Sequence, residues 1–289
     1  MDHKTYVQNT QNLTDKLLDK YIPSDQSEPA LLHEAMRYSV MAGGKRLRPV
    51  LAKATYDYCG GDEASAVSSI HKAMAALEMV HTYSLIHDDL PCMDDDDLRR
   101  GIPTCHKKFG VAVATLAGDA LHVIAFQLMA ETGSSQVVLE LAQAVGTSGM
   151  LGGQMADIEA EGKVVSAEEV RNIHIKKTGA LIRGAVRIGA LLAETPGDTL
   201  KRLTHYGEMI GLAFQIIDDI LDIEGDQKLL GKSPGSDSKN RKATYPGVIG
   251  VEAARKEANR LIDEALSVFN SEDDSALQYL ARYIGQREH

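Results

Sequence analysis

Two clusters of aspartate, each following a long apolar run, constrain this sequence more than any other feature. The first, from His87 to Asp97, begins His-Asp-Asp-Leu-Pro-Cys-Met-Asp, and the second, from Gln215 to Asp222, reads Gln-Ile-Ile-Asp-Asp-Ile-Leu-Asp. Burying so much like charge is prohibitively costly unless cations or water compensate it. Carboxylates without a converging set of His and Cys favour a hard cation, and Mg²⁺ normally binds a few carboxylates together with substrate phosphates. The clusters therefore predict magnesium sites that hold a diphosphate.

The second cluster has the spacing of a carboxylate claw on a helix. Asp218 and Asp222 are four residues apart and share one helix face, and Asp219 lies three residues before Asp222 on its flank. A solvated acidic helix end is the plain alternative. An EF-hand fits neither cluster, because the alternating Asp and Asn ligands, the central Gly and the closing Glu are missing. The spacing favours three metal ligands on one helix.

The first cluster is expected to lie at the end of a helix. Pro91 disfavours helical geometry in the residue before it and donates no backbone hydrogen bond, so the helix should end at Asp88 and Asp89. Asp94 then returns by a short loop, and two arginines follow at positions 99 and 100. Two clusters with adjoining cations favour a diphosphate site over two unrelated solvated helix ends.

Helical spacing dominates the rest of the chain. Gly43 and Gly44 are expected to end one helix, and Pro49 suits the first turn of the next. Ser166 with Glu169 forms a capping box for another. Strand-like alternation is nearly absent, while apolar residues recur every three or four positions. We predict an all-α fold, with helices over residues 30–41, 50–59, 64–90, 112–130, 137–157, 168–193, 200–223, 251–269 and 276–284.

No linker divides the chain. Its 289 residues include only eight prolines, and the apolar 44% is not concentrated in one half. We therefore predict one domain over residues 1–289, a helical bundle around a central cavity. The two aspartate clusters should lie on separate long helices beside that cavity.

Charge and composition exclude several classes of function. The net charge of −10 argues against nucleic acid, because a nucleic-acid binder normally carries a basic stripe. The three cysteines lack metal-ligand spacing. No apolar run reaches the length of a membrane span, and the N-terminus lacks the apolar core of a secretion signal. We expect a cytoplasmic protein that needs magnesium and local cations to bind an anionic substrate.

Two basic segments are candidates for that binding. Lys45, Arg46 and Arg48 directly follow two glycines, and close backbone approach plus cations suits a diphosphate that no metal holds. A solvated turn is the alternative. Lys177 lies in a segment otherwise rich in Ala, Ile and Leu, where a lysine that simply extends to solvent is the alternative. Residues 231–242 read as a mobile lid with four cations, or as an ordinary loop.

The chain resembles the bacterial short-chain trans-prenyltransferases. Five stretches match the motifs of that family in order: the two aspartate clusters, Gly-Gly-Lys-Arg-Leu-Arg-Pro at 43–49, Gly-Gly-Gln-Met-Ala-Asp at 152–157 and Lys-Thr-Gly-Ala-Leu-Ile at 177–182. The first cluster has the bacterial form, with Pro91 and Cys92 as two extra residues. The resemblance runs from about residue 30 to the C-terminus. It implies an isoprenoid synthase fold, a homodimer, and magnesium-dependent condensation of isopentenyl diphosphate with allylic diphosphates, with the released diphosphate taking the proton.

The resemblance also implies a role for each matching residue. The metal ligands would be Asp88, Asp89, Asp94, Asp218, Asp219 and Asp222. Isopentenyl diphosphate would contact Gly44, Lys45, Arg48, His81 and Arg100. The allylic diphosphate would contact Arg99, Lys232 and Lys242, although Arg241 replaces a common Gly and puts the geometry of Lys242 in doubt. The carbocation or the departing diphosphate would be stabilised by Lys177, Thr178 and Gln215.

Chain length is the finer prediction. Tyr83 lies five residues before Asp88, about 7.5 Å along a helix at a rise of ~1.5 Å per residue, although this spacing places it at the side of the path. In the family an aromatic there, next to Ser84, is typical of farnesyl diphosphate synthases, which make fifteen carbons. A Tyr that only packs in the core is the alternative. The other readings are a geranylgeranyl diphosphate synthase, a non-catalytic partner subunit and, below both, a terpene cyclase; the two complete aspartate motifs argue against loss of activity.

Overall fold

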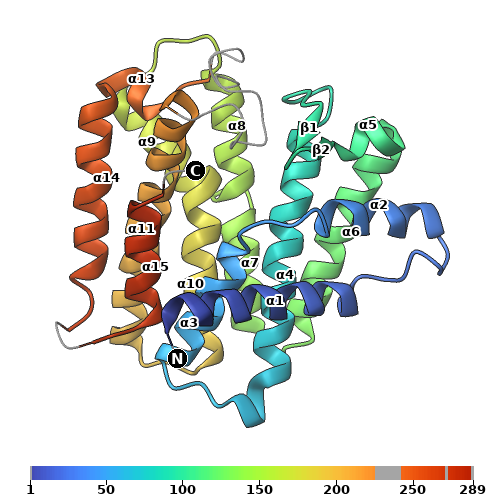
Figure 1. Ribbon diagram of the computed structural model, residues 1–289, viewed down its shortest axis with the longest axis horizontal. Coiled ribbons are helices and arrows are strands. Elements are labelled where there is room, and N and C mark those ends of the chain that lie inside the picture. Colours follow the sequence, from blue (N-terminus) through green and yellow to red (C-terminus); the bar gives the residue numbers. More distant parts are fainter. Residues whose placement is uncertain (1, 225–241, 271–272, 288–289) are drawn as a thin grey trace. The chain divides into compact units, whose positions relative to one another are not determined.

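The computed structural model describes residues 2–224, 242–270 and 273–287, and only the backbone of residues 63–68. The described part is built of helices with one two-residue hairpin, so the all-α prediction is confirmed (Figure 1). It divides into two compact units, Met1–Lys53 with Asp62–Val138, and Ala54–Gly61 with Leu139–His289. A single domain around one central cavity stays a prediction.

The first unit is built around the pairing of α4 and α6. Its elements are α1 (His3–Tyr21), α2 (Ala30–Val40), α4 (Glu63–Asp88), β1 (Leu98–Arg99), β2 (Ile102–Pro103), α5 (Cys105–Phe109) and α6 (Val111–Ala130), with the start of α3 (Leu47–Tyr58) and of α7 (Ser135–Val145). Figure 1 shows α4 and α6 side by side. Leu77 of α4 and Leu121 of α6 are fully buried. The end of α4, where the first aspartate cluster begins, therefore rests on a packed core.

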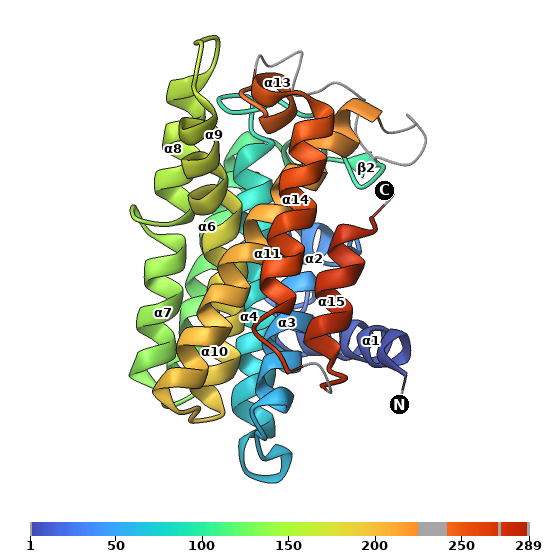
Figure 2. The same cartoon turned by 90° about the vertical axis from the view of Figure 1, so that its left-hand side faces the viewer.

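The second unit packs α10, α11 and α14 together (Figure 2). Its elements are α8 (Met150–Ala160), α9 (Ala167–His174), the π-helix η1 (Ile175–Gly179), α10 (Ala180–Leu192), α11 (Gly197–Glu224), α13 (Tyr245–Ile249), α14 (Val251–Leu266) and α15 (Ala276–Gly285). Tyr206 of α11 is fully buried, and its hydroxyl donates to the carbonyl of Leu277, 2.7 Å away. This contact ties α15 to the helix that carries the second aspartate cluster.

Local signals in the sequence set several helix ends. The helix α4 ends at Asp88, as Pro91 predicts, and the capping box of Ser166 and Glu169 is present. The continuous helix predicted over 137–157 is wrong, because α7 ends at Val145 and α8 begins at Met150. Gly149 directly precedes α8, and a Cβ there would lie 2.2 Å from the Ala144 carbonyl oxygen, so a larger residue does not fit at this break.

Several elements were not predicted, namely α1, the hairpin β1–β2, α5, η1 and α13. The helix α1 precedes the first predicted helix, and its N-terminus is capped by Asp2, which accepts from the backbone N–H of Lys4 and Thr5. The hairpin β1–β2 turns at Arg100 and Gly101, both at positive φ. The π-helix η1 interrupts the predicted helix 168–193. The hairpin and η1 are short and depend on a few backbone positions rather than on a repeating apolar pattern, whereas α1 is a helix of 19 residues.

The helix α6 corrects one prediction. Among the described helices it is long and apolar enough to cross a membrane by length and composition, with a mean hydropathy of 1.6 and 33% of the window buried. The statement that no apolar run reaches that length is therefore wrong for α6. Core helices of soluble proteins meet the same criterion, so α6 is weak evidence for a membrane.

Candidate active site

The first aspartate cluster closes onto the end of α4. The backbone N–H of Asp94 donates to the carbonyl of Asp88 at 2.8 Å, so the loop returns to the helix end as predicted. Asp88 and Asp94 are partly exposed, whereas Asp89 is only 3% exposed. Asp88 and Asp94 therefore both reach solvent at this helix end, and Asp89 does not.

Asp89 is paired with Arg99 of the hairpin. The Nε of Arg99 donates to Asp89 Oδ1 at 3.0 Å, and its NH2 donates to Asp96 Oδ2 at 3.2 Å. Burial lowers the pKa of Arg99, but the hydrogen bond and charge of Asp89 outweigh burial and raise it. The pair holds the hairpin to α4. The metal role of Asp89 and the diphosphate role of Arg99 stay predictions. In each role the residue would bind its ligand while it is also paired with the other residue.

The glycine loop lies against Arg100. Gly43 and Gly44 have φ of +85° and +134°, and a Cβ on Gly44 would lie 2.8 Å from the guanidinium carbon of Arg100. Arg100 donates to the carbonyl oxygen of Gly43. The positive φ of both glycines favours glycine here, and the structure brings Gly44 and Arg100 together. Lys45 of the loop is exposed, whereas Arg48, predicted in the loop, lies in the first turn of α3 and is only 9% exposed.

His81 is neutral at pH 7. Burial, followed by the charges of Arg48 and Arg100, holds the pKa of its imidazole well below the usual 6.5. A neutral ring donates or accepts a hydrogen bond without adding charge to a cluster that is already cationic. One turn later, the hydroxyl of Ser84 donates to the backbone carbonyl of His81 at 2.8 Å. Ser84 therefore supports the helix beside His81.

Tyr83 is the buried member of an aromatic stack. Its side chain is 4% exposed, and its ring lies 4.6 Å from that of His122 on α6 at an interplanar angle of 27°. The His122 ring in turn meets Phe126 edge-on at 5.1 Å. Among the described residues the Tyr83 hydroxyl has no hydrogen-bond partner. Sequence reasoning missed His122, because nothing in the pattern of α6 marks which residue meets Tyr83.

The second aspartate cluster places its three carboxylates in different surroundings. Asp219 is 3% exposed and accepts from His174 Nε2 at 2.8 Å, from the backbone N–H of Tyr245 at 2.9 Å and from Gln215 Nε2 at 3.0 Å. These three donors occupy most of its acceptor positions. Asp222 is partly exposed. The metal role predicted for Asp219 stays a prediction, and its contacts make it a residue that orients its neighbours.

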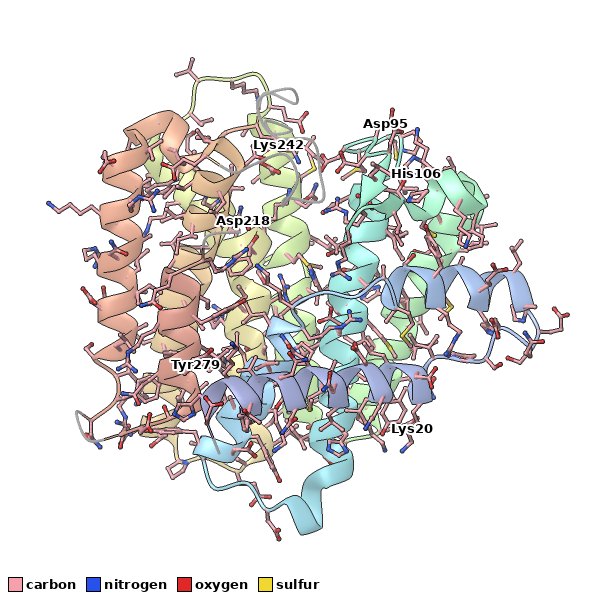
Figure 3. The ribbon with its side chains drawn as sticks, in the orientation of Figure 1. Lys20, Asp95, His106, Asp218, Lys242 and Tyr279 are labelled. Carbon is pink, nitrogen blue, oxygen red and sulfur yellow. The ribbon has the colours of Figure 1, made fainter. Side chains whose placement is uncertain are left out.

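Asp218, labelled in Figure 3, reaches solvent and pairs with Arg287. Its side chain is 50% exposed and accepts from Arg287 NH2 at 3.1 Å. The Arg287 side chain is 8% exposed, and its guanidinium lies 4.4 Å from the ring centroid of Phe214. Sequence reasoning missed Arg287, because nothing local connects it with a residue 69 positions earlier.

The π-helix η1 carries Lys177 and Thr178. The Thr178 hydroxyl donates to Gln215 Oε1 at 2.6 Å, so the structure brings together these two predicted residues. Lys177 Nζ pairs with Asp157 Oδ2 at 2.5 Å. π-Helical turns are frequent at functional sites, because the extra residue displaces the side chains of one turn. Asp157 was noted only as part of a motif, and the structure identifies it as the partner of Lys177.

Two glycines make room for this turn. A Cβ on Gly153 would lie 2.1 Å from the backbone nitrogen of Lys177, and a Cβ on Gly211 would lie 2.9 Å from Cα of Gly179. The 152–157 motif is therefore explained by packing as well as by its acid.

The two lysines predicted to bind the allylic diphosphate differ in what can be said of them. Lys232 lies outside the described residues, and Lys242 is partly exposed and is labelled in Figure 3.

The exposed carboxylates fit magnesium. Among the described side chains, no three of His, Cys, Asp and Glu stand close enough to hold a metal unaided. Magnesium normally binds one or two carboxylates, substrate phosphates and water rather than a complete protein cage. Asp88, Asp94, Asp218 and Asp222, each at least partly exposed, suit such open binding.

Comparison with known proteins identifies the chain's relatives. Residues 29–284 match the model of the polyprenyl synthetase family. Farnesyl diphosphate synthase of Escherichia coli (strain K12) is 46% identical over 301 residues, covering 99% of both chains. Heterodimeric geranylgeranyl pyrophosphate synthase large subunit 1 of Arabidopsis thaliana is 45% identical over 303 residues, covering 100% of this chain and 80% of that one. The crystal structure of a geranyltransferase from Helicobacter pylori, complexed with magnesium and isoprenyl diphosphate, has a TM-score of 0.84 at 30% identity and covers 98% of this chain and 96% of its own.

Proposed function

The chain belongs to the polyprenyl synthetase family and is a trans-prenyltransferase, and we propose that it is a farnesyl diphosphate synthase. It would condense isopentenyl diphosphate head to tail with dimethylallyl and then geranyl diphosphate to give the (2E,6E) fifteen-carbon product. Overall identity does not decide between products, because relatives named for fifteen and for twenty carbons are equally similar. The observation that carries the proposal is the buried stack of Tyr83 on His122 near the first aspartate cluster.

The exposed carboxylates would hold magnesium. In this proposal Asp88 and Asp94 bind it at the first cluster, and Asp218 and Asp222 bind it at the second. Magnesium supplies positive charge to the departing diphosphate and so favours ionisation of the allylic substrate. The resemblance to the family implies that the released diphosphate takes the proton, so this chain needs no side-chain base.

Isopentenyl diphosphate would bind the cations of the glycine loop. Lys45 and Arg48 supply charge, and Arg100 lies against the same loop. The neutral His81 contributes a hydrogen bond without further repulsion among these cations. Charge-assisted hydrogen bonds of this kind are the strong ones for phosphate.

Thr178 and Gln215 would stabilise the allylic cation. Gln215 accepts from Thr178 and donates to Asp219, so the orientation of its amide is determined on both sides. The Thr178 proton is used in this bond, which leaves the lone pairs of its oxygen available for a developing positive charge. His174 hydrogen-bonds to Asp219 and so helps to hold the carboxylate that accepts from Gln215.

We also propose a homodimer formed through α6. Leu116 and Val123, 57% and 66% exposed, are seven residues apart and share a helix face. An exposed apolar face on so long a helix suits a second copy of the chain. Sedimentation of the wild type as a dimer and of Leu116→Glu as a smaller species would support this face, and a monomeric wild type would exclude it.

Product analysis tests the proposed reaction. Labelled isopentenyl diphosphate is supplied with dimethylallyl, geranyl or farnesyl diphosphate, and the products are separated by chain length. We expect mainly fifteen carbons from the first two starters and little extension of the third. A mainly twenty-carbon product would favour the geranylgeranyl synthase, the second candidate because of its equally similar relatives. No product from any starter would favour a partner subunit.

A further inference from the structure

Arg46, which follows Lys45, faces the interior of the first unit. Its side chain is 3% exposed, whereas Lys45 is exposed. The φ of Arg46 is +48°, in the left-handed region that a non-glycine residue rarely adopts. Of the three basic residues at positions 45, 46 and 48, Arg46 is the least exposed and is therefore unsuited to contact a substrate. Its contacts must be explained differently.

The guanidinium of Arg46 joins three helices. Its Nε donates to Asp15 Oδ1 of α1 at 2.9 Å, its NH1 to Glu78 Oε1 of α4 at 2.9 Å, and its NH2 to the carbonyl of Val40, the last residue of α2, at 2.8 Å. We call these contacts the Arg46 brace. The planar guanidinium is suited to three partners in fixed directions, which an ammonium would not hold equally well.

The helix α1 contributes a second contact to the same loop. Gln11 Nε2 donates to the backbone carbonyl of Lys45 at 2.8 Å. Figure 1 shows α1 crossing α4, and the two helices are in contact. This helix, His3–Tyr21, precedes the family match, which begins at residue 29. The brace therefore uses a helix that lies outside the residues matched by the family model.

The Arg46 brace sets the loop against the residues proposed to bind isopentenyl diphosphate. Glu78 is 1% exposed and lies three residues before His81 on the same face of α4. Within the loop, Arg46 is one residue from Lys45 and two from Arg48. Gly43 and Gly44 adopt positive φ without strain, but Arg46 does not, so its contacts with α1, α2 and α4 rather than local backbone preference hold its conformation.

We propose that Arg46 and Glu78, supported by Gln11 and Asp15 of α1, are positioning residues that hold the glycine loop in the conformation that binds isopentenyl diphosphate. The inference rests on the proposed function, because the proposed function assigns isopentenyl diphosphate to the glycine loop. None of the four residues needs to touch the substrate. Replacing them should weaken the binding of isopentenyl diphosphate and leave the binding of the allylic diphosphate unchanged.

Steady-state kinetics separate positioning from general stability. In Glu78→Gln we expect KM for isopentenyl diphosphate to rise on the order of tenfold to a hundredfold, since displacement of a binding group by about 1 Å has effects of this size. KM for geranyl diphosphate should stay within about twofold. Arg46→Lys should give an intermediate rise, because a lysine keeps the charge and loses the fixed directions.

The matched control is Glu140→Gln. Glu140 is 5% exposed and pairs with Arg187 Nε at 2.8 Å, so its loss removes the ion pair of a buried glutamate from the second unit. We expect a lower melting temperature in this control and unchanged KM for both substrates. Gln11→Ala provides a milder test if Glu78→Gln does not fold. It removes one exposed hydrogen bond and should raise only the KM for isopentenyl diphosphate.

The outcomes distinguish this proposal from the proposed function. If the wild type does not extend any allylic starter, the proposed function fails before the brace is tested by kinetics. Calorimetric binding of isopentenyl diphosphate, weaker in Gln11→Ala than in wild type, would then still support the brace. Equal rises in both KM values, or variants that only melt earlier as Glu140→Gln does, would overturn it.

Discussion

Replacing Tyr83 with alanine should lengthen the product by at least one isoprene unit. The ring is 4% exposed and lies against His122, so its removal leaves space between α4 and α6. Burying the five carbons of one more unit is worth up to about 4 kcal/mol at ~0.8 kcal/mol per methylene. Even about 1 kcal/mol of this would shift the ratio of extension to release about fivefold. We therefore expect mainly twenty carbons or more.

The same change should destabilise the free enzyme. Loss of a buried aromatic ring costs about 3–5 kcal/mol, because the surroundings only partly fill the cavity. The melting temperature should therefore fall by roughly 6–20 °C, at about 2–4 °C per kcal/mol for a chain of this size. A twenty-carbon diphosphate should recover more of that stability in Tyr83→Ala than in the wild type, because its tail fills the space.

Tyr83→Phe is the control for ring removal. The Tyr83 hydroxyl has no hydrogen-bond partner among the described residues, so its loss should leave stability unchanged or slightly higher. Product length should stay at fifteen carbons. Chromatography of the labelled products and a thermal melt measure both effects. The reasoning would be refuted by an unchanged product in Tyr83→Ala, or by a wild type that already makes mainly twenty carbons.

Three further predictions concern metal and pH. Asp218→Ala, or excess chelator, should reduce condensation at least a hundredfold, since charge stabilisation by the metal is worth several kcal/mol; near-normal rates would exclude the metal assignment. Arg287→Gln should lower the Kd for magnesium with a bound substrate analogue about fivefold, because an ion pair with the half-exposed Asp218 is worth at most about 1 kcal/mol; calorimetry that finds weaker metal binding would contradict this competition. His81 has a folded pKa well below 6.5, so stability should be constant above pH 6.5 and fall as the pH drops below it, by up to about 1.4 kcal/mol per pH unit; urea unfolding of His81→Asn between pH 7 and 5 should show a smaller slope, and an equal slope would remove His81 as the cause.

Local sequence was enough to predict the fold class and the ends of the functional helices. Apolar spacing predicted most of the helices, and Pro91 predicted the end of α4 at Asp88. Such signals are read reliably because they depend on residues within one or two turns. The glycines at 146 and 149 also carried a local signal, but the apolar pattern on both sides concealed the break between α7 and α8.

The aspartate motifs themselves show where local reasoning stops. Helix spacing places Asp218, Asp219 and Asp222 close together, yet Asp219 is buried among donors from α9, α11 and α13, while Asp218 reaches solvent. Asp89 differs from Asp88 in the same way through its pairing with Arg99. Spacing identifies the cluster, and only distant partners determine which carboxylates remain accessible.

What the sequence determined by itself is the chemistry that this chain brings to its substrates: two sets of carboxylates, a glycine loop with cations, and the helices that carry them. Tertiary structure alone decided that Arg46 faces inward to α1 and α4 while Lys45 is exposed, and that Tyr83 lies against His122. The physical reason is that a side chain's role depends on burial and on partners tens of residues away. Adjacent residues of the same type therefore acquire different functions only when the helices pack.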